Sequence, residues 1–318
     1  MSNIKKLPLT DVQFAYMFGR NSSIYLGGIA THFYAEFDTK LNPKRFEEAL
    51  NKVIQRQEML RAYICKDGTQ VIMEEVPYYE VEYTDLSKLT EEEKTKEIES
   101  YRAQNSNRII PLDKWPMFGF KFFRKDEESS VLAVDIDMMI VDGMSTELLI
   151  HQVMQYYNGE AVEPTIEVCF SDYMELEKQK REKMEAVDKE FWMQNIQNFT
   201  AGPFIEKVQK DAPDIPYFYS LENVIEAEKW SAVERKLRKQ RILPTIYLLT
   251  AYARMVSAWT NNEKLTINMT VSDRNNGYGK NFNETIGDFT KILPVDFDFT
   301  ESEDLITTAK KTQNKIAE

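Results

Sequence analysis

In the segment "DIDMMIVDGMSTELL" (residues 135–149), an apolar strand gives way to a helix between two acids. Asp137 and Asp142 bracket the apolar run at residues 138–141. The amphipathic residues that follow predict a helix from about Ser145. A carboxylate at such a junction costs free energy unless a partner pairs it. The two acids therefore serve either chemistry or the structure of the turn.

The sequence around this junction predicts a mixed α/β fold. The stretches "MFGFKFF" (117–123) and "SSVLAVDID" (129–137) flank a charged turn, which indicates a strand pair. Thr10 and Gln13 have the spacing of a capping box, which marks the start of a helix. Helices are predicted at residues 10–18, from 43, 90–100, 172–191 and from 244, and a further strand at 264–271.

Composition restricts the class of protein. With 318 residues and 42% hydrophobic side chains, the chain exceeds the usual length of one domain, so two lobes are expected. The formal charge of -12 comes from 52 acids against 40 bases without a long basic block, which argues against nucleic-acid binding. No apolar run has the length of a membrane span, and the N-terminus lacks the apolar stretch of a signal peptide. We expect a cytoplasmic protein.

Histidine and cysteine are scarce. Cys65 and Cys169 are too few and too far apart for a disulfide framework or a CxxC metal site, so both are expected as reduced thiols. Catalytic triads and most zinc sites use histidine, and only His32 and His151 are present. Each histidine is expected to be a packed or surface residue, and no metal site is predicted.

Six segments, in order along nearly the whole chain, resemble the heterocyclization domains of nonribosomal peptide synthetases, a branch of the condensation-domain superfamily. The stretch "DMMIVDGMS" (137–145) matches their DxxxxDxxS pattern, and "GDFTKILPVDF" (287–297) resembles their GDFT motif. The other segments are "LPLTDVQFAYMFGR" (7–20), "RQEMLRAYICKDGTQ" (56–70), "IPLDKWPMFGF" (110–120) and "LTINMTVSDR" (265–274).

The resemblance implies an α/β fold of two chloramphenicol-acetyltransferase-like lobes in a V arrangement, with a tunnel between them. Residues 1–170 are expected to form the N-terminal lobe and residues 171–318 the C-terminal lobe. The proline-containing segment 202–214 is a candidate connection between lobes. Family members continue past the GDFT motif and supply there a Thr and an Asp implicated in cyclodehydration. We therefore expect the second lobe to be incomplete and truncated, and the 318-residue chain alone to be inactive.

The implied reaction joins a donor acyl or peptidyl thioester to the amine of a carrier-bound Cys, Ser or Thr. The side-chain thiol or hydroxyl then attacks the new amide carbonyl, and loss of water leaves a thiazoline or oxazoline. The expected partners are donor and acceptor carrier proteins, which bring the substrates on phosphopantetheine arms, and neighbouring synthetase domains such as the adenylation domain. No cofactor is expected to bind the domain directly.

The motif acids have a catalytic and a structural interpretation. Ordinary condensation domains carry HHxxxDG at this place, whereas this chain has Asp137 and Met138 at the two His positions. A thioether cannot accept a proton at neutral pH. Asp137 is either an acid/base group facing the tunnel, with its pKa raised by burial, or the partner of an arginine. Asp142 is expected to cap the following helix and to pair with Arg61, which matches the superfamily's arginine.

Two hydroxyl residues complete the candidate site. Ser145 is expected to be a cap or a tunnel-wall hydroxyl rather than a nucleophile, because neither His has a motif position that would activate it. Thr290 either lines the tunnel or occupies a strand. The cyclodehydration residues are expected beyond residue 318.

Three functions stay open: a heterocyclization domain, a catalytically silent condensation-like domain that docks carrier proteins, and a stand-alone acyltransferase, against which Met138 argues.

Overall fold

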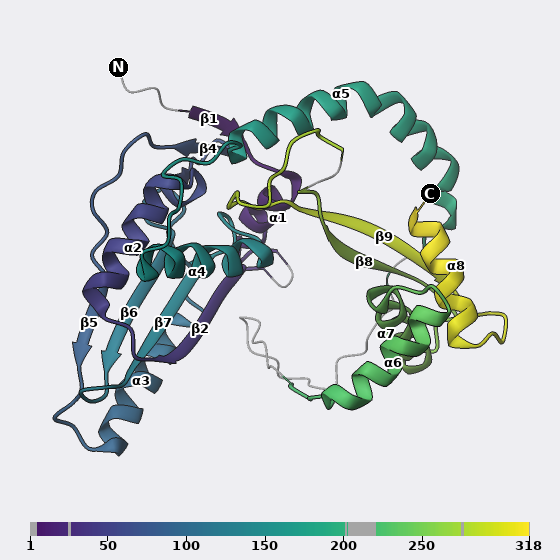
Figure 1. Cartoon of the computed structure of the whole chain (residues 1–318). Helices are drawn as coiled ribbons and strands as arrows, with labels where there is room; N and C mark the ends of the chain where they lie inside the picture. Colours follow the sequence, from purple (N-terminus) through teal and green to yellow (C-terminus); the bar gives the residue numbers. More distant parts are fainter. Residues whose placement is uncertain (1–4, 25–26, 201, 203–220, 275–276, 318) are drawn as a thin grey trace. The chain divides into compact units, whose positions relative to one another are not determined.

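The computed structural model describes residues 5–24, 27–200, 202, 221–274 and 277–317 (Figure 1). The strands are β1 (Lys5–Pro8), β2 (His32–Thr39), β3 (Ala62–Ile64), β4 (Thr69–Ile72), β5 (Glu82–Asp85), β6 (Phe118–Arg124), β7 (Ser130–Asp137), β8 (Lys264–Ser272) and β9 (Thr290–Asp298). The helices are α1 (Asp11–Gly19), α2 (Pro43–Arg56), η1 (Met59–Arg61), α3 (Glu91–Asn105), α4 (Gly143–Asn158), α5 (Phe170–Asn195), η2 (Ile196–Asn198), α6 (Ala227–Lys239), α7 (Pro244–Thr260) and α8 (Leu305–Ala317).

The chain forms two compact units. The first consists of Met1–Glu182 and Ser272–Lys291, and the second of Lys183–Val271 and Ile292–Glu318. This division differs from the predicted lobe boundary at residue 170, because the late segment 272–291 packs with the first unit and the boundary falls within α5.

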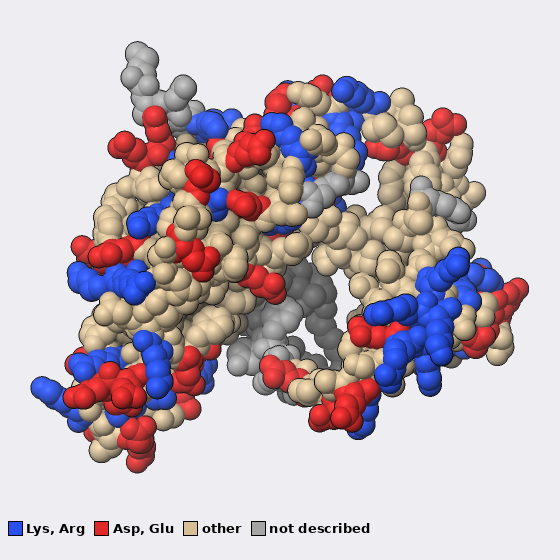
Figure 2. Space-filling view, in the orientation of Figure 1, with Lys and Arg blue, Asp and Glu red and all other residues tan. Residues whose placement is uncertain are grey.

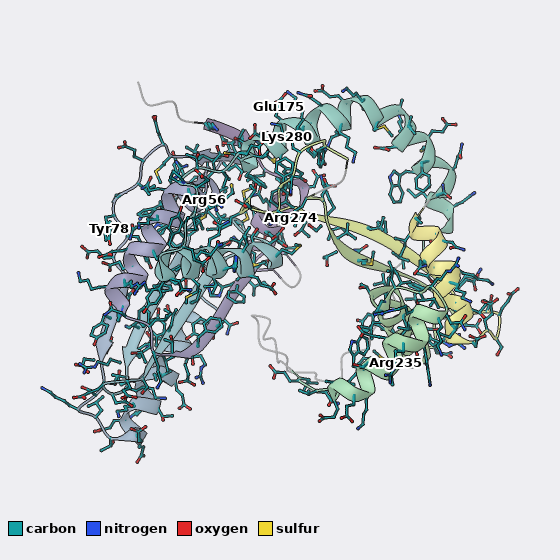
Figure 3. The ribbon with its side chains drawn as sticks, viewed as in Figure 1. Arg56, Tyr78, Glu175, Arg235, Arg274 and Lys280 are labelled. Atoms are coloured by element: carbon teal, nitrogen blue, oxygen red, sulfur yellow. The ribbon has the colours of Figure 1, made fainter. Side chains whose placement is uncertain are left out.

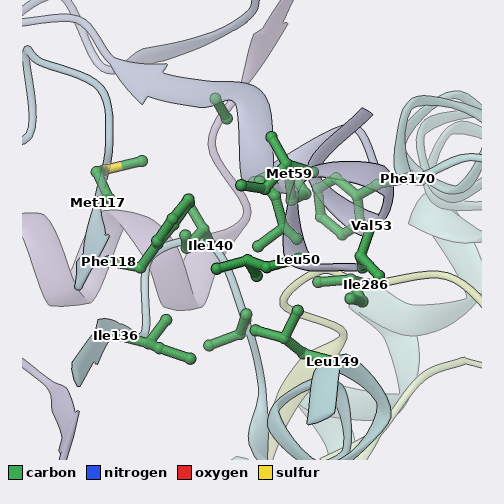
Figure 4. Close-up of a cluster of buried hydrophobic side chains, with 14 of the residues drawn as sticks. Leu50, Val53, Met59, Met117, Phe118, Ile136, Ile140, Leu149, Phe170 and Ile286 are labelled. Atoms are coloured by element: carbon green, nitrogen blue, oxygen red, sulfur yellow. The ribbon is translucent and has the colours of Figure 1, made fainter. Parts of the chain in front are cut away.

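A four-stranded sheet in the order β2-β7-β6-β5 organises the first unit. β7 runs antiparallel to both β2 and β6, while β5 runs parallel to β6. One face of the sheet contributes Phe118, Phe120 and Ile136 to a large core that also contains Leu50 of α2 and Leu149 of α4 (Figure 4). The strand pair predicted around the charged turn is confirmed. The other face packs Phe123, Val131 and Ala133 against Ile98 of α3.

Capping residues set the helix boundaries of this unit. Thr10 and Gln13 form the predicted capping box of α1. The Asn42 side chain accepts a hydrogen bond from the backbone of Arg45, so that α2 begins at the proline that follows Asn42. α4 ends at Gly159, whose φ of 77° is a left-handed conformation that glycine adopts without strain.

The second unit contains α6, α7, α8 and most of the two-stranded β8–β9 sheet, of which residues 272 and 290–291 belong to the first unit. Ala253 of α7 packs with Leu265 of β8 and with Val295 and Phe297 of β9. The predicted strand at 264–271 and the predicted helix from Pro244 are confirmed. The predicted connection at 202–214 lies outside the described residues apart from Gly202.

Surface charges of both signs are interspersed over much of the face in Figure 2, and Lys and Arg gather where Figure 1 places α6 and α8. The last turn of α6 carries Lys236, Arg238 and Lys239. Cations at this end of a helix are favoured by its dipole, which accounts for their position. Among the described residues, no helix combines the length and hydrophobicity needed to span a membrane.

Candidate functional site

Asp142 stands between β7 and α4 and is the N-cap residue of α4, as predicted. Its Oδ1 accepts a hydrogen bond from the backbone N–H of Ser145 at 2.6 Å. Its Oδ2 accepts one from the backbone N–H of Phe289 at 3.2 Å. The carboxylate therefore satisfies the first turn of α4 and also holds the GDFT segment, which is distant in sequence.

Arg274 supplies the positive charge that pairs with Asp142. Its Nη2 lies 3.0 Å from Asp142 Oδ1 and also donates to Ser145 Oγ at 2.6 Å. Its Nη1 donates to the carbonyl oxygens of Phe282 and Thr285. The side chains of Arg274 and Asp142 are only 3% and 7% exposed, and Arg274 is labelled in Figure 3. This buried guanidinium therefore joins the motif to residues 282–285.

The predicted pair between Asp142 and Arg61 is wrong. The Arg61 Nη1 atom donates instead to the carbonyl oxygens of Met73 and Glu74. The reason is that residues 272–291 pack with the first unit and bring their own arginine, Arg274, to the motif.

Ser145 is completely buried and ties the motif to Gly287. Its Oγ donates to the Gly287 carbonyl oxygen at 2.7 Å and accepts from the Gly287 N–H at 3.0 Å. The expectation of a cap or tunnel-wall hydroxyl is corrected, because Asp142 is the cap and the hydroxyl is internal. The Ser145 hydroxyl therefore hydrogen-bonds both the N–H and the C=O of Gly287.

Gly287 fills a place that admits no side chain. A Cβ atom there would lie 2.1 Å from Cδ2 of Phe170, which is far inside van der Waals contact. The Gly287 carbonyl oxygen also accepts from the Asp142 N–H at 3.1 Å. Just before it, the Ile286 N–H donates to Gln57 Oε1 at 3.0 Å. The GDFT segment is thus fixed against α2, α4 and α5.

Asp137, the first motif acid, ends β7 and is completely buried. Its Oδ2 forms an ion pair with Arg20, and its Oδ1 accepts from the Met139 N–H at 3.1 Å. Arg20 in turn donates to the carbonyl oxygen of Ile110 at 2.9 Å. Met138 packs against the hydrophobic core. Both oxygens of Asp137 are engaged, which favours the interpretation of Asp137 as the partner of an arginine.

Asp288 is a buried carboxyl group that the sequence analysis missed. It is 1% exposed, and its Oδ1 accepts from the Thr290 N–H at 3.1 Å, whereas Oδ2 has no hydrogen-bond partner among the described residues. Burial raises the pKa of Asp288 to about 6, Asp142 adds to the effect, and Thr290 and Lys291 oppose it. Burial and the charge of Asp288 also raise the pKa of Tyr16 to about 12. Asp288 is therefore a carboxyl group beside the motif whose pKa is raised to about 6 by burial.

Thr290 is the first residue of β9, the strand position that one of its two interpretations predicted. Lys291 next to it pairs with Glu177 of α5 at 2.8 Å. In the part of the chain that the structure describes, no group of three or more His, Cys, Asp or Glu side chains could hold a metal ion.

Comparison with known proteins identifies the family. A family model described as "Condensation domain" matches residues 3–318. The chain belongs to the condensation-domain family. The motif at residues 137–145 and the GDFT segment are thus two parts of one condensation domain that its fold brings into contact.

Curated relatives of this condensation domain are much longer proteins. Bacitracin synthase 1 of Bacillus licheniformis is 29% identical over 93% of this chain and 6% of that protein. Pyochelin synthetase PchF of Pseudomonas aeruginosa is 25% identical over 96% of this chain and 17% of its own length. Phenyloxazoline synthase MbtB of Mycobacterium tuberculosis is 24% identical over 97% of this chain and 22% of its own length. The chain therefore spans less than a quarter of each of these relatives.

Solved structures confirm the predicted α/β class as the condensation-domain fold. The EpoB cyclization-docking bidomain from Sorangium cellulosum superimposes with a TM-score of 0.89 at 26% identity, covering 98% of this chain and 64% of that one. The epimerization domain of tyrocidine synthetase TycB3 gives a TM-score of 0.80 at 18% identity, covering 99% and 74%.

Two arginines of the site were missed by sequence analysis although the motifs contain them. Arg20 is the last residue of the segment 7–20 that resembles the family's opening motif, and Arg274 is the last residue of the segment 265–274. An arginine that ends a family segment, combined with two unpaired motif acids, is the signal that could have predicted both ion pairs.

Proposed function

We propose that this condensation domain is a heterocyclization domain of a nonribosomal peptide synthetase. The observation that carries the proposal is the DxxxxDxxS pattern of residues 137–145, which forms one hydrogen-bonded unit with the GDFT segment. Three of its relatives support the proposal by their names: a pyochelin synthetase, a phenyloxazoline synthase and a cyclization domain.

In the proposed reaction, the amine of a carrier-bound Cys, Ser or Thr attacks the donor thioester, and an amide forms as the donor thiol leaves. The side-chain sulfur or oxygen then adds to the amide carbonyl, and the former carbonyl oxygen leaves as water to give a C=N bond in the ring. The donor and acceptor carrier proteins and the neighbouring synthetase domains are the proposed partners. Phosphopantetheine arms of the carriers bring both substrates, and the domain itself binds no other cofactor.

The motif residues have a structural part in this proposal. Asp137 is engaged by Arg20, and Asp142 and Ser145 are engaged by Arg274 and the GDFT backbone. These contacts stabilise the end of β7, the start of α4 and residues 282–289 relative to one another. The chemistry of water loss is assigned to other groups of the domain.

The test is an intact-mass measurement on the acceptor carrier. The synthetase that contains this domain is given an acyl-loaded donor carrier and an acceptor carrier loaded with Cys, Ser or Thr. We expect the condensed product minus one water for at least one of the three amino acids. Condensation without water loss for all three would assign the domain to ordinary peptide-bond formation instead.

A second candidate function is a catalytically silent domain that docks carrier proteins. It is favoured by the same internal contacts, since the motif acids and Ser145 are all occupied within the protein. Carrier binding without any amide product in the same measurement would support this alternative.

A further inference from the structure

His32 lies directly opposite the first motif acid. In the antiparallel β2–β7 pair the register joins His32 to Asp137, and Tyr34 to Asp135. Directly paired residues of antiparallel strands point to the same face of a sheet, and residues two apart on one strand share that face. The imidazole therefore stands on the sheet face that carries the carboxylates of Asp135 and Asp137.

The contact to Ser106 fixes which ring nitrogen of His32 carries a proton. His32 Nδ1 lies 3.1 Å from the carbonyl oxygen of Ser106. A carbonyl oxygen only accepts, so Nδ1 must be the donor. In the neutral ring Nε2 is then the proton acceptor, and this atom is buried without a hydrogen-bond partner among the described residues.

On the sheet face around His32 Nε2, each of the two β7 carboxylates already pairs with an arginine. Arg20 pairs with Asp137, and Arg108 pairs with Asp135 at 2.6 Å. Burial raises the pKa of Asp135, while Arg108 and His32 oppose the effect. Other charged or titratable side chains on this side come from β2, β5, β6 and α3: Tyr34, Glu36, Asp38, Glu82, Tyr101, Arg102 and Lys121. Asp38 pairs with Lys125.

Gly119 keeps room for this charge cluster. A Cβ atom at Gly119 would lie 2.8 Å from an Arg108 nitrogen and 2.9 Å from Asp135 Oδ1. The ion pair therefore occupies the volume that a side chain on β6 would fill. The carboxylates of Asp135 and Asp137 are thus matched in charge by the guanidiniums of Arg108 and Arg20, and a third cation nearby would add a net positive charge.

We infer that His32 is a positioning residue for the proposed reaction, acting on Asp137 through the charge of its ring. The neutral ring leaves Asp137 to Arg20, which keeps the end of β7 and the motif in place. A protonated ring adds a third cation to Arg20 and Arg108 on the face that carries the β7 carboxylates Asp135 and Asp137, so that it competes with Arg20 for Asp137. In this proposal the domain catalyses condensation when the His32 ring is neutral. The inference rests on the proposed function for its catalytic consequence, and its structural part stands separately.

The structural part is tested by nitrogen-15 NMR of the two histidines in this chain. His151 is exposed on α4 and gives the reference signal. At pH 8 we expect His32 in the Nδ1–H form, and its assignment comes from the loss of its signal in His32→Asn. An Nε2–H form for His32 would overturn the inference, since the ring would then not accept a proton at Nε2.

The catalytic part is tested by the pH profile of condensation in the intact synthetase. The His32→Asn side chain keeps an amide N–H near the position of Nδ1 and has no titratable nitrogen. We expect the condensation rate of wild type to fall between pH 8 and 5.5, and that of His32→Asn to fall much less. His151→Asn should follow wild type.

Asp288→Asn is measured beside these variants, because Asp288 also titrates near this range. An acid limb that persists in His32→Asn but disappears in Asp288→Asn would overturn the role of His32. A wild-type protein that forms no amide at any pH would contradict the proposed function, while the NMR result would still decide the tautomer.

Discussion

Replacing Arg274 by Met should destabilise the motif more severely than replacing Arg61 by Met. The substitution keeps an unbranched side chain of similar length and removes the charge. Asp142 then stays buried without its cation, and the carbonyl oxygens of Phe282 and Thr285 lose their donor. Arg61→Met is the matched control, because Arg61 was the partner predicted from sequence.

The magnitude follows from the burial of both partners. Removing one member of a buried ion pair costs about 3–5 kcal/mol, because the remaining charge is uncompensated. Such a loss is a large part of the roughly 5–15 kcal/mol that stabilises a typical domain. Arg61 donates to the carbonyl oxygens of Met73 and Glu74, and loss of those hydrogen bonds is expected to cost about 1–2 kcal/mol.

Urea unfolding of a double-mutant cycle measures the pairing itself. Asp142→Asn is combined with Arg274→Met and, separately, with Arg61→Met. We expect a coupling free energy of about 1–3 kcal/mol for Asp142 with Arg274, and a value within about 0.5 kcal/mol of zero for Asp142 with Arg61. Coupling to Arg61 with none to Arg274 would refute the assignment of the ion pair.

Three further changes test the surroundings of the motif. Asp288→Asn should be more stable than wild type at pH 8 by up to about 3 kcal/mol, because ionisation of a group whose folded pKa is raised to about 6 costs wild type stability as pH rises through that value. The gap should close below pH 4, and urea midpoints that keep the same difference at both pH values would contradict this. Ser145→Ala should lower the free energy of unfolding in urea by about 1–3 kcal/mol, since the buried Gly287 N–H loses its acceptor. An unchanged urea midpoint would contradict the contribution of this hydrogen bond to stability. Gly287→Ala should lower the melting temperature through overlap with Phe170, worth about 1–3 kcal/mol or more, whereas Gly143→Ala, which meets no atom within 4 Å, should melt close to wild type. Equal melting of the two alanine variants would argue against the close contact.

Local signals were sufficient for most of the fold. The capping box at Thr10, the proline after Asn42 and the charged turn between β6 and β7 each depend on residues within a few positions of one another. Such short-range chemistry predicts where helices begin and which strands form hairpins. The condensation-domain segments then supplied the fold class.

Ion pairs between residues far apart in the sequence could not be predicted from such local signals. The sequence analysis named Arg61 as the partner of Asp142, whereas Arg274 is the partner, because the choice depends on which segment packs beside α4. Nothing in the local pattern of residues 272–291 states that they belong to the first unit. Asp288 was missed for the same reason, because its raised pKa comes from burial that only the packed structure creates.

The most direct measurement compares the two products on the acceptor arm for wild type and Asp142→Asn. Intact-mass analysis in the intact synthetase, at a temperature where the variant is folded, gives the ratio of uncyclized amide to dehydrated ring. If the motif acid holds the structure and performs no chemistry, both products fall together and the ratio stays that of wild type. Accumulation of uncyclized amide in the folded variant would contradict this and make Asp142 a participant in water loss.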